Sequence, residues 1–370
     1  MSTISQAKIS ALELPTEILL LIAGYCSRSQ LCRLVFLNSR FHNALIAAVY
    51  SDVTLESRRL IEKFSHTVAH GRSILKDLTQ SLNINPKQTT VKLLYPLANT
   101  IRQALSHMTN LRNLTLSLQH KAVKSIFRDA SYPFTLTRLA CPAISGREFY
   151  RFLHSQVLLE ELVILRSVRG GITVGTVLRN VSSESLPLLQ SVSASFETLA
   201  ALIPGRPVTK VSTGPAALGP GDYDTFASSL SQSSAQMNVV DLSISYLWTT
   251  IVLSNSSRLF ASLHRYSVQP RHLVINLTLP DILHTRDPTI WHRYASDMLE
   301  DFYATILNCL EHLDLSAFHR LEIFEITQRQ GLTIWIKRNR PFSKEQLVLE
   351  AMKRSVPSLK TLSLFGLEIR

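Results

Sequence analysis

One short pattern recurs along most of the chain: three apolar residues spaced as LxxLxL. This spacing suits a short strand that buries alternate side chains, preceded by an apolar residue that packs the turn leading into the strand. Full copies occupy residues 111–116, 159–164, 239–244, 310–315 and 359–364. Weaker copies occupy residues 82–84, 136–141, 189–194 and 273–277. The pattern predicts a series of similar strand units.

The stretches between the copies carry apolar residues at helical spacing, as at Leu97, Ile101 and Leu105. Successive copies lie about 20 to 50 residues apart, whereas regular leucine-rich repeats have periods of about 20 to 29 residues. An ordinary α/β domain with a parallel sheet shares this alternation, but its strands favour Val and Ile runs over LxxLxL. We therefore expect an α/β fold over residues 78–370, in the form of an irregular leucine-rich-repeat solenoid of parallel strands and helices.

Two segments interrupt the pattern. Residues 204–222 are dense in Gly and Pro and predict a loop on the edge of the solenoid. Between residues 320 and 338, two alternating apolar runs flank Gln328-Arg329-Gln330-Gly331 and predict a β-hairpin.

Residues 12–55 follow a different pattern, that of a small helical module. A helix is predicted from Leu14-Pro15, because proline is tolerated in a first helical turn and Glu17 there suits the helix dipole. The run over residues 18–23 is apolar on every side, whereas a surface helix keeps one polar side. This helix therefore needs to be covered on both sides.

Two further helices are predicted behind it, one opening at Ser29-Gln30 and one from about Asn38. The third helix places Phe41, Leu45 and Val49 on one stripe. A module of about forty residues rarely has a sufficient core of its own, so a partner surface is expected.

These residues together resemble the F-box, the module with which F-box proteins dock on the adaptor Skp1 of cullin-RING ubiquitin ligases. The match runs Leu14-Pro15-x-Glu17-Ile18-Leu19-x-x-Ile22, Leu31-x-x-Leu34, Ser39-Arg40-Phe41 and Tyr50-x-x-Val53-x-Leu55. Many members of the family carry Trp in place of Phe41, and an aromatic residue of either kind can fill the same groove. An ordinary helical cap on a larger domain would also explain three helices, but not the apolarity of the first one.

The resemblance implies an F-box over residues 10–56, followed by a substrate-binding region over residues 78–370, since F-box proteins often carry leucine-rich repeats behind the docking module. Ser57 can cap a further helix, which makes residues 57–77 a connector. The residues implied to contact Skp1 are Leu14, Pro15, Ile18, Leu19, Ile22, Leu31, Leu34, Val35, Phe41 and Leu45.

The net charge of +12 is unevenly distributed. Basic and acidic residues balance over residues 1–56, so the whole excess falls on residues 57–370. Such an excess can attract an acidic or phosphorylated protein, or it can serve solubility alone. Arginine grips phosphate with a planar fork, so the candidates for substrate binding, chosen from their position after strands, are Arg166, Arg169, Arg338 and Arg340.

The sequence offers little for catalysis. It contains no GxxxxGK[ST] phosphate loop, no GxGxxG, no GxSxG elbow and no HExxH, and its four cysteines lack CxxC spacing. We expect no catalytic residue, no cofactor and no metal, with the cysteines as free thiols. No apolar run approaches the roughly 18 residues of a membrane span, so we expect no membrane partner and a location in the cytoplasm, the nucleus or both.

Two functions follow from these patterns. The first is a non-catalytic, substrate-recognition adaptor of an SCF (Skp1-cullin-F-box) E3 ubiquitin ligase, whose F-box binds Skp1 and whose repeats bind a protein for ubiquitination. The second is a scaffold outside any ligase, or a nucleic-acid-binding repeat protein that uses its basic surface. Nucleic acid is disfavoured, because the densest basic cluster, around Lys337 and Arg338, is not interleaved with stacking aromatics.

Overall fold

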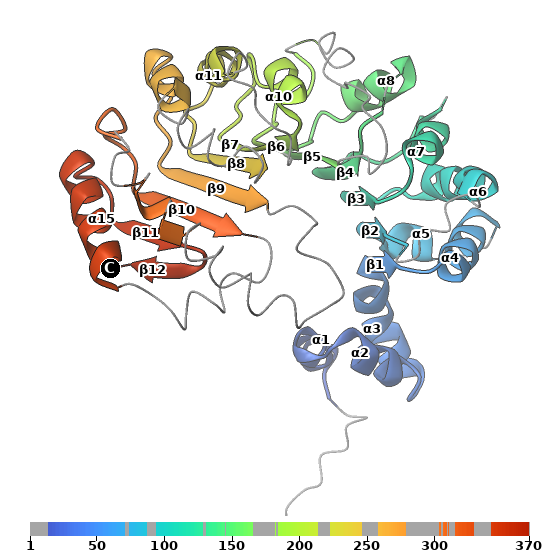
Figure 1. The fold of residues 1–370 in the computed structure, drawn as a ribbon. Coiled ribbons are helices and arrows are strands. Elements are labelled where there is room, and N and C mark those ends of the chain that lie inside the picture. The colour runs from blue at the N-terminus through green and yellow to red at the C-terminus, as the bar shows by residue number, and fades with distance from the viewer. Residues whose placement is uncertain are drawn as a thin grey trace, which may run out of the picture. The chain divides into compact units, whose positions relative to one another are not determined.

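Strands and helices alternate along most of the chain in the computed structural model (Figure 1). The structure describes residues 14–70, 74–86, 94–128, 131–144, 146–165, 182, 184–213, 223–245, 258–278, 303–304, 306–308, 310, 315–328 and 342–369. The chain divides into two units, Met1–Pro142 and Ala143–Arg370. Each unit is α/β, with a mostly parallel arrangement of strands.

The first unit pairs its strands in parallel and in chain order. These strands are β1 (Asp52–Leu55), β2 (Ser81–Ile84), β3 (Asn113–Leu116) and β4 (Arg138–Pro142). The helices that follow them are α4 (Arg58–His70), α5 (Leu75–Leu78), α6 (Leu94–His107) and α7 (His120–Phe127). Strand β1 lies inside the range expected for the helical module, and its pairing with β2 joins that module directly to the strands. Helix α4 falls within the expected connector, residues 57–77.

The second unit continues the same scheme with seven strands paired in parallel and in chain order. They are β5 (Glu161–Leu165), β6 (Ser191–Ala194), β7 (Lys210–Thr213), β8 (Val239–Ser245), β9 (His272–Thr278), β10 (Ile323–Gln328) and β11 (Thr361–Leu364). Its helices include α8 (Arg147–Ser155), α10 (Phe196–Leu202), α11 (Tyr223–Ser231) and α15 (Phe342–Ser355), and residues 258–265 are helical as well. Within each unit the helices lie along one side of the strands (Figure 1).

The last strand, β12 (Leu367–Ile369), differs because it pairs antiparallel with β11. Phe365 and Gly366 connect the two strands with φ values of 54° and 78°. Two consecutive residues with positive φ are the mark of a type I′ hairpin turn, whose twist matches that of the flanking strands. The side chain of Phe365 is buried, which holds a bulky residue in a backbone conformation that such residues rarely adopt.

The LxxLxL pattern corresponds to a buried row in each unit. Leu82, Leu114 and Leu139 lie side by side on neighbouring strands of the first unit, and all three are buried. The matching row of the second unit is buried too: Leu162, Val192, Val211, Val240, Leu273, Phe324 and Leu362. Parallel pairing at constant register places equivalent residues next to each other, so one apolar position per repeat is sufficient to build a continuous core.

The structure shifts one predicted copy, and another lies partly outside the described residues. Val240 pairs with Val211 and Leu273, so the copy expected over residues 239–244 begins instead at the buried Met237. A shift of two residues keeps the same side chains on the same face, which is why an alternating run could not settle the register. The copy expected over residues 310–315 falls partly outside the described residues, and the next strand is β10.

The predicted β-hairpin over residues 320–338 is wrong for its first arm. Strand β10 pairs in parallel with β9 on one side and with β11 on the other, so both of its edges are occupied. The second predicted arm, residues 332–336, lies outside the described residues.

The predicted loop over residues 204–222 is also wrong in part, because it contains strand β7. Val208 and Val211 are fully buried, and they form a weak copy of the repeat pattern that the surrounding Gly and Pro residues obscured. Residues 214–222 lie outside the described residues.

Arg206 anchors the start of this Gly- and Pro-rich stretch. Its side chain is 1% exposed, and its guanidinium donates to the carbonyl oxygens of Ser185 (2.8 Å), Leu202 (2.6 Å) and Ser182 (2.6 Å). The Leu202 carbonyl belongs to the last turn of α10, which has no intrahelical donor. Burial lowers the pKa of this arginine. The buried guanidinium thus connects the end of α10 to Ser182 and Ser185.

Replacing this arginine tests the role of the buried guanidinium. Arg206→Met keeps most of the volume but leaves the three carbonyls without their donor, and we expect a loss of about 3 kcal/mol in the free energy of unfolding. The matched control is Lys210→Met, which removes a cation from an exposed position four residues later and should change stability by less than about 0.5 kcal/mol. Urea denaturation followed by circular dichroism measures both; equal effects would contradict a structural role for Arg206.

Candidate docking surface

The first three helices share a core of their own. They are α1 (Thr16–Tyr25), α2 (Arg28–Val35) and α3 (Ser39–Ser51). The predicted stripe on the third helix is confirmed, since Phe41, Leu45 and Val49 are all buried. The complete buried cluster is Leu19, Ala23, Leu31, Val35, Phe41, Leu45 and Val49.

Local hydrogen bonds fix where these helices begin. The Pro15 carbonyl accepts from the amides of Ile18 and Leu19, both at 3.1 Å, so α1 begins directly after the proline. Helix α2 begins with a capping box between Ser27 and Gln30, which places its start just before the expected Ser29-Gln30.

Two further contacts hold α3 in place. Asn38 caps this helix by accepting from the Phe41 amide at 2.9 Å. The Arg40 guanidinium donates to the Leu14 carbonyl, which ties the residues in front of α1 to α3. The positions of α1 and α3 are thus joined by a polar contact as well as by their shared core.

Helix α1 presents a second apolar side that this core does not cover. Ile18, Leu21, Ile22 and Tyr25 follow one another at i, i+3, i+4 and i+7, and their exposed fractions are 40%, 60%, 40% and 87%. We call these four residues the α1 stripe. Their spacing puts them on one side of the helix, away from the inward-facing Leu19.

Other exposed apolar side chains lie on the same three-helix module. Leu20 is 48% exposed, and Phe36 and Leu37, which directly follow α2, are 85% and 64% exposed. Large apolar groups left in water at this density mark an interaction site more often than an ordinary surface.

The residues predicted to contact Skp1 separate into three groups. Pro15, Ile18 and Ile22 are exposed, and Leu14 and Leu34 are half-buried. Leu19, Leu31, Val35, Phe41 and Leu45 are buried in the module itself, where they hold the three helices together.

Five exposed residues of the module were not among those predicted to contact a partner: Leu20, Leu21, Tyr25, Phe36 and Leu37. Helical phase is the signal that could have found the two on the α1 stripe, because Leu21 and Tyr25 lie three and seven residues after Ile18. The four arginines proposed for substrate binding, Arg166, Arg169, Arg338 and Arg340, lie outside the described residues.

The chemistry of the docking surface is that of apolar burial. Glu17 is the acidic residue of α1, and the α1 stripe itself carries no charge. Cys26 and Cys32 are half-buried free thiols beside the cluster. Such a surface is suited to binding by excluding water from a complementary apolar groove.

Among the described residues, no group of three or more His, Cys, Asp or Glu side chains could hold a metal ion. No helix in the described part of the chain is long and apolar enough to cross a membrane. Cys141 is a buried thiol in the first unit, and burial raises its pKa, which makes it unreactive.

Comparison with protein-family models and with curated proteins finds no match for this chain.

Substitutions of two phenylalanines, five residues apart, distinguish the core of the module from its exposed surface. Phe41 is 7% exposed, so Phe41→Ala should cost about 3 to 5 kcal/mol of stability. Phe36 is 85% exposed, so Phe36→Ala should change stability by less than about 0.5 kcal/mol. Thermal and urea unfolding of the full chain measure both values, and a large loss for Phe36→Ala would show that Phe36 packs against the protein itself.

Proposed function

We propose that this protein is a substrate-recognition adaptor of an SCF E3 ubiquitin ligase. In this proposal helices α1–α3 dock on Skp1, and the strand and helix units behind them hold a protein to be ubiquitinated. The observation that carries the proposal is the α1 stripe, which leaves Ile18, Leu21, Ile22 and Tyr25 in water on a module whose sequence resembles an F-box.

Burial of the α1 stripe would contribute substantially to the free energy of binding a partner. Complete burial of a large apolar side chain contributes about 1.5 to 3 kcal/mol, so covering four that are already partly buried contributes about 1 kcal/mol each. Together they would change the dissociation constant about a thousandfold. A partner that covers this side of α1 would therefore bind through the stripe more than through any single polar contact.

The function divides between separate parts of the chain. The described part of α1–α3 lacks a catalytic constellation, so ubiquitin transfer would come from other ligase subunits, with this protein holding the substrate close to them. The substrate side would use strand positions that face away from the buried rows. There Ser212 donates to Asp241 at 2.9 Å, Asn276 also bonds to Asp241, and Thr327 bonds to Asn276, in a chain of hydrogen bonds across four strands.

This polar face does not suit an acidic ligand. The Glu325 carboxylate lies in the same row as Asp241, two strands further on, and approaches His272 Nε2 at 3.5 Å. Two carboxylates in one row repel phosphate or carboxylate groups. An acidic partner, one of the two interpretations of the net charge, would have to bind elsewhere.

The experiment removes the apolar stripe without disturbing the helix. Ile18→Ala with Ile22→Ala keeps good helix formers and leaves the buried cluster intact, and it should weaken recovery of Skp1 with the full chain by more than about tenfold. The measurement is co-purification with Skp1, followed by titration calorimetry with the purified proteins.

The matched control is Val157→Ala with Leu188→Ala. These two residues are also exposed, at 50% and 42%, but they lie in the second unit. The control should leave recovery of Skp1 unchanged. Equal recovery from the stripe variant and the unaltered protein would rule out docking through α1.

A further inference from the structure

The three outer helices of the first unit carry a concentration of positive charge. Helices α4 and α6 pack together, as do α6 and α7, so they form one layer. Glu62 is the one acidic residue within these helices. The basic residues of the layer, including the residue that ends α7, are Arg58, Arg59, Lys63, Arg102, Lys121, Lys124 and Arg128. We call this set the basic helix face.

Helix α4 arranges its exposed charges along one line. Arg59, Lys63, His66 and His70 follow one another at successive turns, and all four are exposed. The rings of His66 and His70 lie 4.6 Å apart. On α7, Lys121 and Lys124 are exposed as well. An anionic partner would therefore meet cations across the width of the layer rather than at one point.

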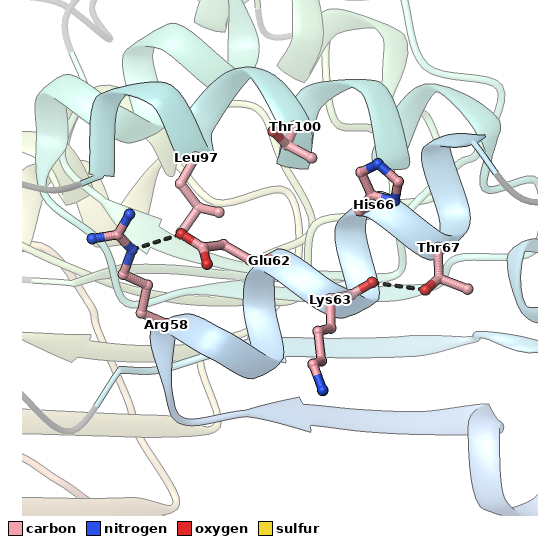
Figure 2. Close-up of a pocket in the computed structure, with 7 residues that line it drawn as sticks. All are labelled: Arg58, Glu62, Lys63, His66, Thr67, Leu97 and Thr100. Atoms are coloured by element: carbon pink, nitrogen blue, oxygen red, sulfur yellow. Dashed lines mark hydrogen bonds and ion pairs between the residues drawn. The ribbon is translucent and has the colours of Figure 1, made fainter.

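A shallow groove of about 580 Å³ lies between α4 and α6 (Figure 2). Helix α4 lines it with Arg58, Glu62, Lys63, His66 and Thr67, and α6 lines it with Leu97 and Thr100. Figure 2 shows the His66 ring turned toward α6 and the Lys63 ammonium extending away from it, at the outer rim.

Glu62 offsets only part of the positive charge of this groove. Its carboxylate accepts from Arg58 Nε at 2.6 Å, and the Lys63 ammonium, which also lines the groove, leaves a net positive charge. The other guanidinium nitrogens of Arg58 have no described bonding partner. Arg58, His66 and Thr100 thus line a groove that is large enough for a side chain, with donors for a carboxylate or a phosphate.

The layer suits an acidic protein better than nucleic acid. The phenylalanines of these helices, Phe64 and Phe127, are not exposed, so among the described side chains unpaired bases could stack only on small imidazole rings such as those of His66 and His70. A groove that accepts one side chain, within a wide field of cations, matches an extended segment rich in acidic groups.

We propose that the basic helix face binds an acidic segment of a partner protein, with one aspartate, glutamate or phosphorylated side chain entering the groove between α4 and α6. This goes beyond the docking function proposed for α1–α3 and does not depend on it, since no residue of the basic helix face belongs to those helices. The two proposals can therefore fail separately.

The test uses the full chain and a fluorescein-labelled oligoglutamate peptide, with binding followed by fluorescence anisotropy. Arg59→Glu with Lys63→Glu should weaken binding by more than about tenfold, and raising the salt from about 50 to 300 mM should weaken binding to the unaltered protein severalfold. The control with the same charge change, Lys353→Glu with Arg354→Glu, alters exposed residues of α15 in the second unit and should weaken binding much less. Equal losses from both charge reversals would overturn the proposal, because they would reflect net charge alone.

A second variant tests the groove without changing charge. Thr100→Phe fills the space beside His66 and should reduce peptide binding at least about threefold, with an unchanged circular dichroism spectrum. Unaltered binding to Thr100→Phe would remove the groove from the proposal. Tighter binding of a short DNA duplex than of oligoglutamate, lost in Arg59→Glu with Lys63→Glu, would overturn the acidic-protein assignment in favour of nucleic acid.

Discussion

The constant register of the parallel strands is the constraint on which the rest of this structure depends. In the second unit the first amide of nearly every strand bonds to the carbonyl just before the preceding strand, as Lys210 does to Gln190 and His272 to Asn238. Because the register repeats, Val211, Val240 and Leu273 lie side by side on neighbouring strands. This alignment does not require the helices between the strands to be alike. The helices can then vary in length and composition, which leaves their outer surfaces open to carry charge.

The three-helix module carries more apolar surface than its core can cover. Leu19 on one side of α1 packs against α2 and α3, while Leu21 and Tyr25 on another side remain in water. A helix buries both of its sides only when it packs between two surfaces. The described part of the chain supplies one of these surfaces, the core formed with α2 and α3. The apolar excess is thus the physical reason to expect a partner, whereas the positive charge is concentrated elsewhere, on α4, α6 and α7.

Much of the fold was predictable from the sequence, because the buried rows need the same residue types at the same spacing in every repeat. The strand at Leu114 and the stripe at Phe41 follow from periodicity alone. Strand β7 was missed because Gly and Pro residues surround its weak copy of the pattern, which consists of the buried Val208 and Val211. The three-helix module was predictable from the sequence, but its exposed surface was not. A run that is apolar on every side does not show which side packs against the protein and which side remains in water.

Hydrogen–deuterium exchange of the full chain, with and without purified Skp1, tests whether a partner buries the α1 stripe. If Skp1 covers this side of α1, backbone amides from Ile18 to Tyr25 should exchange more slowly in the complex, because a covered helix opens less often. Amides of α10 in the second unit should exchange at the same rate in both samples. Unchanged exchange across α1 in the presence of saturating Skp1 would contradict the account.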